Sequence, residues 1–321
     1  MDFEICRLFN IKYPIIQGAM ARVSESSLAS AVSEAGGLGV LASGIDSYGQ
    51  VKSEIQKIKG ATNKPFAVNI MLLSPHVEDI VRLVCEESVK IVFTGAGNPI
   101  KYMPIFKSLG IKVVPVVPSV ALAKAMERAG ADAIVAEGME AGGHIGKLTT
   151  MALLPQAVDA VGIPVIGAGG VGDGRGMAAC FMLGAKGVQI GTRFLLADEC
   201  IAHDNYKGAV IKAKDIDTTI TGQITGHPIR VLRNKLSKAF EDLEKEELRK
   251  PEPDLRRFDE LGAGALKAAV IDGDIKNGSL MAGQISGLLS KRETCSQIIN
   301  NIMCEFDSCL KKYSTQAGNK P

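Results

Sequence analysis

Short apolar runs alternate with helix-like segments along about the first two hundred residues, and this alternation limits the possible folds more than any other feature. Eight runs favour β-strands, and they begin near Pro14, Gly39, Phe66, Ile91, Val113, Ala133, Val165 and Val188. Helical periodicity fills most of the gaps, over residues 26–34, 51–59, 77–87, 120–129, 152–161 and 175–183. Repeated strand–helix units predict an α/β fold with a parallel sheet. Eight of them match the (β/α)8 TIM barrel, and the open doubly wound sheet is the competing topology.

One glycine motif is typical of doubly wound sheets, but in this chain its flanking elements are in the reverse order. Residues 37–42 match Gly-x-Gly-x-x-Ala, but they follow a helical segment and lead into a strand. Dinucleotide-binding sheets place this motif after a strand and before a helix, because its glycines bring the phosphates to the helix start. The barrel is therefore the preferred interpretation.

The rest of the chain predicts additions to the barrel. We expect a barrel core at residues 1–213, then an extension and carboxy-terminal helices at 214–313 that form a helical subdomain packing on the barrel. Mixed charge dominates residues 241–260, which predicts a solvated helix ending at the prolines of that segment. Residues 314–321 have the composition of a frayed tail.

Composition narrows the class of protein. A net charge of +2 over 321 residues, without a basic tract interleaved with aromatics, argues against nucleic acid as a partner. No segment is apolar for long enough to predict a membrane span, and the amino-terminal residues do not resemble a signal peptide. The seven cysteines lack zinc-type spacing, so we expect no metal site and reduced thiols in a cytoplasmic protein. Cys180 fits the core face of a helix.

A histidine follows a glycine pair just after one of the strand-like runs. The sequence Glu137-Gly-Met-Glu-Ala-Gly-Gly-His144 comes directly after the run 132–136, so Glu137 would end the strand and His144 would lie in the loop. Barrel enzymes keep their catalytic groups at these carboxyl ends of strands. His144 is thus the candidate catalytic residue, because imidazole changes protonation near neutral pH. The alternative is a loop histidine that only hydrogen-bonds the backbone.

Two later strands end in glycine-rich turns. The residues at these exits are Gly169, Gly170, Gly191 and Thr192. Loops after the seventh and eighth barrel strands often bind phosphate through backbone N–H groups and a helix N-terminus. The alternative is that the glycines only permit tight turns. Asn69 and the backbone after the first strand would open on the same face and contact the polar edge of a flat heterocycle. A phosphate joined to such a heterocycle indicates FMN, although other phosphorylated ligands use similar sites.

Several of these segments together resemble the nitronate monooxygenase superfamily of FMN barrels. The shared segments are Pro14–Met20, Ala35–Gly39, Glu140–His144, Gly169–Gly170 and Gln189–Thr192. Within that superfamily, residues 143–155 and 221–235 resemble the bacterial FMN-dependent enoyl-[acyl-carrier-protein] reductases of type II. The resemblance covers nearly the whole barrel. It implies cofactor-binding positions at Ala19, Met20, Asn69, Glu137, Gly142, Gly169, Gly170, Gln189, Ile190, Gly191 and Thr192.

The narrower resemblance implies a reaction. NADH would reduce FMN, and a hydride would then pass to the β-carbon of a trans-2-enoyl thioester held by acyl carrier protein, the last step of each fatty-acid elongation cycle. His144 would orient the nicotinamide or the thioester carbonyl, or supply the proton at the α-carbon. Oxidation of alkyl nitronates by O₂ is the alternative on the same fold. A non-catalytic flavin-binding barrel is the alternative from another class, and a homodimer is a further expectation from the family.

Three features carry weaker expectations. Monooxygenases commonly have glutamine at the position of Glu137, and an ionised glutamate only accepts hydrogen bonds whereas glutamine also donates. Residues 281–287 resemble a family segment near the flavin phosphate, although helix packing explains the same residues. Four basic residues allow two interpretations, namely Arg230, Arg233, Lys235 and Lys238. They could form a basic edge that attracts an acidic carrier protein. We favour the alternative, a charged helix face in solvent.

Overall fold

The computed structural model describes residues 3–318, and its core is a closed parallel barrel. The eight strands are β1 (Ile15–Gln17), β2 (Gly39–Ala42), β3 (Phe66–Met71), β4 (Ile91–Gly95), β5 (Lys112–Val117), β6 (Ile134–Glu137), β8 (Val165–Ala168) and β9 (Gly187–Ile190). They pair in the order β1-β9-β8-β6-β5-β4-β3-β2. A parallel bridge between Ile16 and Leu38, the residue before β2, joins the two ends of this sheet. The predicted TIM barrel is confirmed, and the open sheet is excluded.

Apolar side chains fill the barrel and close its amino-terminal end. Ile16, Val40, Phe93 and Val135 are among the buried residues of the interior. Helix α1 (Glu4–Phe9) adds Phe9, whose ring centre lies 6.2 Å from that of Phe93. Because this end is plugged, the carboxyl ends of the strands are left for a ligand site.

The helices on the outside of the barrel match the sequence prediction closely. The predicted helices are α2 (Ser26–Glu34), α3 (Tyr48–Ala61), α4 (Val77–Glu86), α6 (Val120–Arg128), α7 (Thr150–Ala160) and α8 (Gly174–Met182). Strand β2 begins with glycine because α2 packs directly on it: a Cβ atom on Gly39 would lie 1.8 Å from the Ala29 carbonyl oxygen. The chain also forms short helices that no long periodic pattern predicts, namely η1 (Ile100–Tyr102), α5 (Met103–Ser108), α9 (Thr192–Leu195) and α10 (Asp204–Lys212).

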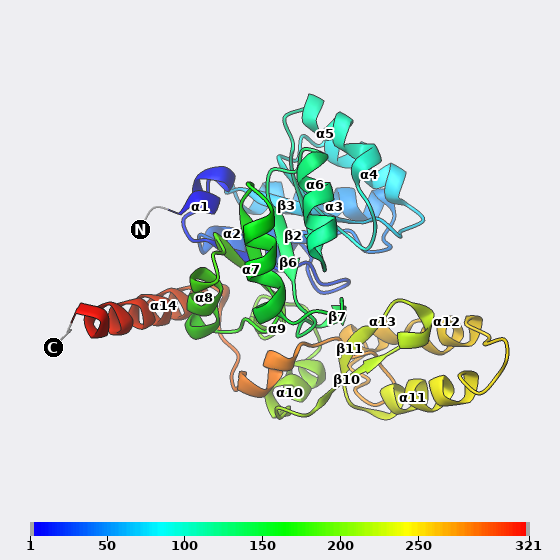
Figure 1. Cartoon of the computed structure of the whole chain (residues 1–321). Coiled ribbons are helices and arrows are strands. Elements are labelled where there is room, and N and C mark those ends of the chain that lie inside the picture. The colour runs from blue at the N-terminus through cyan, green and yellow to red at the C-terminus, as the bar shows by residue number, and fades with distance from the viewer. Residues whose placement is uncertain (1–2, 319–321) are drawn as a thin grey trace.

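A second, three-stranded antiparallel sheet lies outside the barrel, and the sequence did not predict it. Its strands are β10 (Thr218–Thr221), β11 (Ile229–Leu232) and β7 (Gly143–His144), in the order β10-β11-β7. The 3₁₀ turn η2 (Gln223–Thr225) connects β10 to β11. Figure 1 shows this sheet beside the yellow helices that follow it in sequence. The extension is therefore not purely helical.

The highly charged segment contains the expected helix ending before the prolines, and a second helix follows them. Helix α11 (Lys235–Glu247) ends before the prolines, and α12 (Arg256–Gly262) begins after them, followed by α13 (Ala265–Val270). Glu247 is fully buried; its carboxylate pairs with Lys250 and Arg257 and accepts a hydrogen bond from the backbone N–H of Asp254 at 2.8 Å. The charged residues hold the turn between the helices together, which an exposed helix would not require.

The carboxy-terminal segment returns to the barrel. After the 3₁₀ helix η3 (Gln284–Leu288), helix α14 (Cys295–Gly318) packs against α8 and α2. The helix continues past the expected boundary at residue 313, and the last part of the expected tail, residues 319–321, lies outside the described residues. None of the helices within residues 3–318 combines the length and the apolar composition that crossing a bilayer requires.

The packing of α14 on α8 generates a prediction about stability. Phe306 is 1% exposed, and its ring centre lies 5.0 Å from that of Phe181 in α8 and 6.3 Å from that of Phe3. Phe306→Ala removes this ring from a packed core and should lower the free energy of unfolding by about 3–5 kcal/mol. Asn300→Ala on the exposed face of α14 should change it by less than about 0.5 kcal/mol. Urea unfolding followed by circular dichroism measures both variants, and equal stability would contradict the packing.

Candidate functional site

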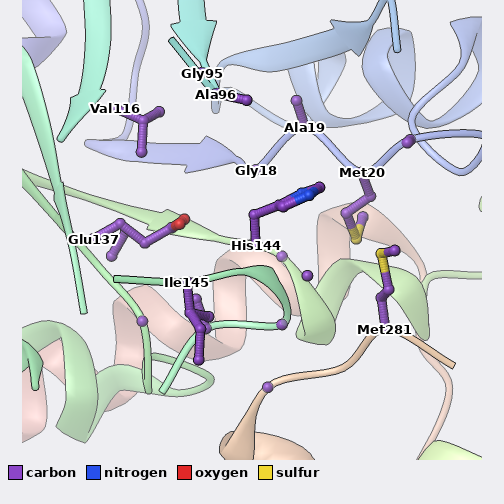
Figure 2. Close-up of a pocket in the computed structure, with 18 of the residues that line it drawn as sticks. Gly18, Ala19, Met20, Gly95, Ala96, Val116, Glu137, His144, Ile145 and Met281 are labelled. Atoms are coloured by element: carbon purple, nitrogen blue, oxygen red, sulfur yellow. The ribbon is translucent and has the colours of Figure 1, made fainter. Parts of the chain in front are cut away.

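A cavity of about 750 Å³ opens at the carboxyl ends of the barrel strands, within the size range of ligand sites. Its wall includes the ends of barrel strands, the loop that carries His144 and the segment around Met281 (Figure 2). Nearly all the predicted site residues line it, namely Ala19, Met20, Asn69, Glu137, Gly142, His144, Gly169, Gly170, Gln189, Gly191 and Thr192. The structure thus brings together residues from distant parts of the sequence.

Ile190 is the exception among the predicted positions. It does not line the cavity, and its side chain is buried in the core between strands and helices. Its carbonyl oxygen accepts a hydrogen bond from the backbone N–H of Gly18 at 2.8 Å. Ile190 therefore supports the loop after β1 from behind.

A buried glutamine shapes the loop after β1. The Gln17 side chain is fully buried; its Nε2 donates to Ser24 Oγ at 2.7 Å, and its Oε1 accepts from the Val40 N–H at 3.0 Å. Ser24 Oγ in turn accepts from the Met20 N–H at 2.9 Å. This network holds Ala19 and Met20 against the cavity. Sequence reasoning did not single out Gln17, although a polar side chain inside a buried strand was the available signal.

Three polar side chains on the cavity wall have no protein partner. Asn69, Glu137 and Gln189 lie at the carboxyl ends of β3, β6 and β9. Among the described residues, no group hydrogen-bonds or ion-pairs with their side chains. Buried or half-buried polar groups are normally satisfied, so these three are available to a polar ligand. Desolvation raises the pKa of Glu137 to about 7.

The loop from β6 to β7 is fixed on two sides. The Glu140 carboxylate accepts from the backbone N–H of Thr150 at 2.9 Å and from its hydroxyl at 3.0 Å. The Glu140 carbonyl accepts from the Gln284 N–H at 2.9 Å. A Cβ atom on Gly142 would lie 2.7 Å from the Gly283 nitrogen, so glycine is needed for this close approach. Met281, Gly283 and Ile285 line the cavity, so the segment 281–287 reaches the candidate site.

The second sheet positions His144. His144 pairs with Ile229 across β7 and β11, and the Ile145 N–H donates to the Pro228 carbonyl at 3.1 Å. His144 projects into the open cavity, and Figure 2 shows its imidazole between Glu137 and the two methionines Met20 and Met281. Desolvation lowers the pKa of His144, and the charge of His227 lowers it further. These effects favour the neutral imidazole, in which one nitrogen donates and the other accepts, over the imidazolium.

Arg230 does not belong to a basic edge. It is 4% exposed; its Nε donates to the Met139 carbonyl at 3.0 Å and its Nη1 to Thr218 Oγ1 at 3.1 Å. It therefore ties the loop of His144 to the second sheet. Arg233 pairs with Glu241 and Lys238 with Asp242, which agrees with the favoured interpretation of a solvated charged face.

The glycine exits of β8 and β9 offer backbone donors to an anion. Among the described residues, the N–H groups of Gly170, Gly191 and Thr192 donate to no protein acceptor. Gly169 and Gly170 have φ values of +92° and +70°, a conformation that glycine adopts without strain. The Thr192 hydroxyl accepts from the Gly283 N–H at 3.0 Å, so it joins these turns to the carboxy-terminal segment.

The amino terminus of α8, which follows these glycines, has its first backbone donors already bonded within the protein. Asp173 caps this helix and accepts from the N–H groups of Arg175 and Gly176, both at 3.0 Å. The Gly174 N–H donates to Glu305 at 2.8 Å. These donors are already used, so an anion would depend on the glycine turns instead.

Apolar residues line the side of the cavity formed by β3, β4 and β5. They include Met71, Leu73, Phe93, Val116, Pro118 and Leu122. Sequence reasoning assigned them only to strands, turns and helices. Leu73 lies just after β3, and its apolar side chain is 55% exposed. In the sequence it looks like any leucine that packs between a strand and a helix. Within residues 3–318 no cluster of His, Cys, Asp or Glu is arranged to hold a metal ion.

Comparisons with known proteins agree with this architecture. The family model for nitronate monooxygenase matches residues 4–83 and 75–305. The solved structure of FabK from Thermotoga maritima is 44% identical, covers 98% of this chain and 99% of its own, and superposes with a TM-score of 0.94.

Two curated relatives cover similar lengths. A probable nitronate monooxygenase of Staphylococcus saprophyticus is 32% identical over 97% of this chain and 99% of its own length. A dehydrogenase of Rhodococcus jostii, named for (3aS,4S,5R,7aS)-5-hydroxy-7a-methyl-1-oxo-octahydro-1H-indene-4-carboxyl-CoA, is 32% identical over 94% of each chain. The matches extend through the barrel, the second sheet and the carboxy-terminal segment. The chain belongs to the nitronate monooxygenase family.

Proposed function

We propose that this protein is an FMN-dependent enoyl-[acyl-carrier-protein] reductase that uses NADH in the cytoplasm, at the last step of the fatty-acid elongation cycle. The observation that carries the proposal is the likeness to FabK, the enoyl-[acyl-carrier-protein] reductase II, along nearly the whole of both chains. The relative named for a carboxyl-CoA substrate adds support, because it indicates that thioesters are accepted among similar proteins.

The cavity fits FMN. Asn69, Glu137 and Gln189 supply unpartnered polar groups for the edge of the flavin heterocycle, as described above. Gly170 and Gly191 supply backbone N–H groups for the phosphate. Both sets of groups line the same cavity of about 750 Å³, which has room for the cofactor and part of a second ligand.

The residues around this cofactor suit reduction of an enoyl thioester. FMN, when bound, supplies the hydride chemistry between NADH and the β-carbon of the substrate. The substrate also gains a proton at its α-carbon, so its C=C bond becomes a single bond. Neutral His144 can donate its N–H to the thioester carbonyl oxygen, on which negative charge develops; delivery of a proton to the α-carbon would use its imidazolium form, which returns to neutral imidazole.

Apolar residues provide the place for the acyl chain. Leu73, Phe93 and Leu122 are on the side of the cavity formed by β3, β4 and β5. Burial of methylene groups there would contribute about 0.8 kcal/mol for each group. A substrate with an alkyl chain therefore gains binding energy that a small polar substrate does not.

Oxidation of alkyl nitronates by O₂ is the second candidate. The family model and the staphylococcal relative carry the name of this activity. The same flavin site would serve both reactions, but only the reductase needs NADH and an enoyl thioester. The two activities are therefore separated by their substrates and by the need for oxygen.

Anaerobic NADH oxidation tests the proposal. The purified FMN-loaded protein should oxidise NADH when trans-2-enoyl thioester of acyl carrier protein is added, with one saturated product formed per NADH. Absorbance at the NADH band and mass spectrometry of the product measure the two quantities. Consumption of nitronate in air without NADH, together with no enoyl reduction, would assign the protein to the second candidate.

Replacing His144 tests its catalytic role. His144→Ala should lower kcat by roughly 10²-fold or more, because general acid–base groups contribute about 10²–10⁴-fold. FMN should remain bound, since the candidate phosphate donors lie on the turns after β8 and β9. His76→Ala is a matched control, because His76 does not line the cavity and its side chain does not cap α4. Turnover equal to that of the control would remove His144 from the mechanism.

A further inference from the structure

Glu137 differs from the other shielded carboxylates of this protein. Glu247 is fully buried and pairs with Arg257 and Lys250, and the 12%-exposed side chain of Glu293 pairs with Arg193. Glu140 accepts hydrogen bonds from Thr150. Carboxylates removed from water are normally paired or hydrogen-bonded in this way. Glu137 has neither kind of partner among the described residues, although its oxygens face the cavity (Figure 2).

The surroundings of Glu137 leave its charge uncompensated. It pairs with Ala168 across β6 and β8, and the neighbouring end of β5 presents Val116 to the cavity. The loop that follows β6 contributes Glu140 and His144 as titratable groups. Glu140 is directed to Thr150, and the lowered pKa of His144 disfavours its charged form. The more distant titratable groups on the wall are His227 and Tyr206, whose hydroxyl donates to the Met281 carbonyl at 2.8 Å.

We infer that Glu137 binds FMN as a neutral carboxylic acid that donates a hydrogen bond to a carbonyl oxygen of the flavin, so that the protein takes up a proton as it binds its cofactor. This inference rests on the proposed function only for the identity of the cofactor. Proton balance is simple: an ionised Glu137 in the free protein gains one proton from the solvent, and no other bond is made or broken.

Two physical arguments support the neutral form. The flavin edge carries two carbonyl acceptors beside one N–H donor, and an ionised carboxylate would repel the carbonyls while a protonated one donates to them. The acid then presents the same donor that a glutamine side chain presents at this position. Desolvation already raises the pKa of Glu137 to about 7, so protonation at neutral pH costs little.

The test is the pH dependence of FMN affinity, measured by quenching of FMN fluorescence in the apoprotein between pH 6 and pH 8.5. With a pKa of about 7, the protonated share of Glu137 falls from about nine tenths to a few per cent across this range. The apparent Kd should therefore rise about 10- to 30-fold more in the wild type than in Glu137→Gln. The FMN phosphate and His144 titrate in the Gln variant as well. The ratio of the wild-type Kd to the variant Kd at each pH therefore isolates the contribution of Glu137.

Glu140→Gln is the matched control, because it changes a carboxylate of the same loop that is directed to Thr150. It should retain the wild-type pH slope, whatever its absolute affinity. Calorimetry at pH 8 in two buffers of different ionisation enthalpy should show about one more proton taken up by the wild type than by Glu137→Gln.

Equal slopes in the wild type and Glu137→Gln, or equal proton uptake, would overturn the inference. Such a result would leave the proposed function intact, because FMN would still bind. Absence of FMN binding by the wild type at every pH would instead overturn the proposed cofactor and the inference with it. A pH dependence of the FMN Kd that disappears in Glu137→Gln and persists in Glu140→Gln would support the inference.

Discussion

The antiparallel pairing of β7 with β11 is the interaction on which the candidate site depends. A barrel strand end can place Glu137, but it does not by itself fix a residue seven positions further along a glycine-rich loop. The pairing of His144 with Ile229 does so, and Arg230 reinforces it through the Met139 carbonyl. The cost of burying an arginine without a carboxylate partner indicates that holding this loop in place matters to the fold. The second sheet is thus a structural part of the site.

The cavity wall contains two kinds of polar group, and their difference explains its chemistry. Gln17 and Glu140 have their hydrogen bonds satisfied within the protein and serve to hold loops in place. Asn69 and Gln189 have none and remain available to a ligand. Ligand binding to this wall breaks few hydrogen bonds within the protein, because the groups that contact the ligand have no protein partners to give up.

The sequence predicted the barrel and most of the wall, and its failures have physical causes. Strands buried on both faces and amphipathic helices leave strong periodic patterns, so the barrel strands and six helices appeared at nearly their observed positions. Strand β7 has two residues, and its partner was recognised only as a family-like segment, so no periodicity revealed their pairing. Ile190 lies between two ligand-facing positions, and alternation along a strand turns it away from the cavity.

The segment around Gly283 has a consequence for how the protein is made. The wall of the cavity combines Gly18 near the start of the chain with Ile285, most of the way to its end. A ribosome that has synthesised the eight barrel strands has therefore not yet released the residues that complete the cofactor site. A chain that ended after β9 would lack Met281, Gly283 and Ile285, and its cavity would be open on the side that these residues cover.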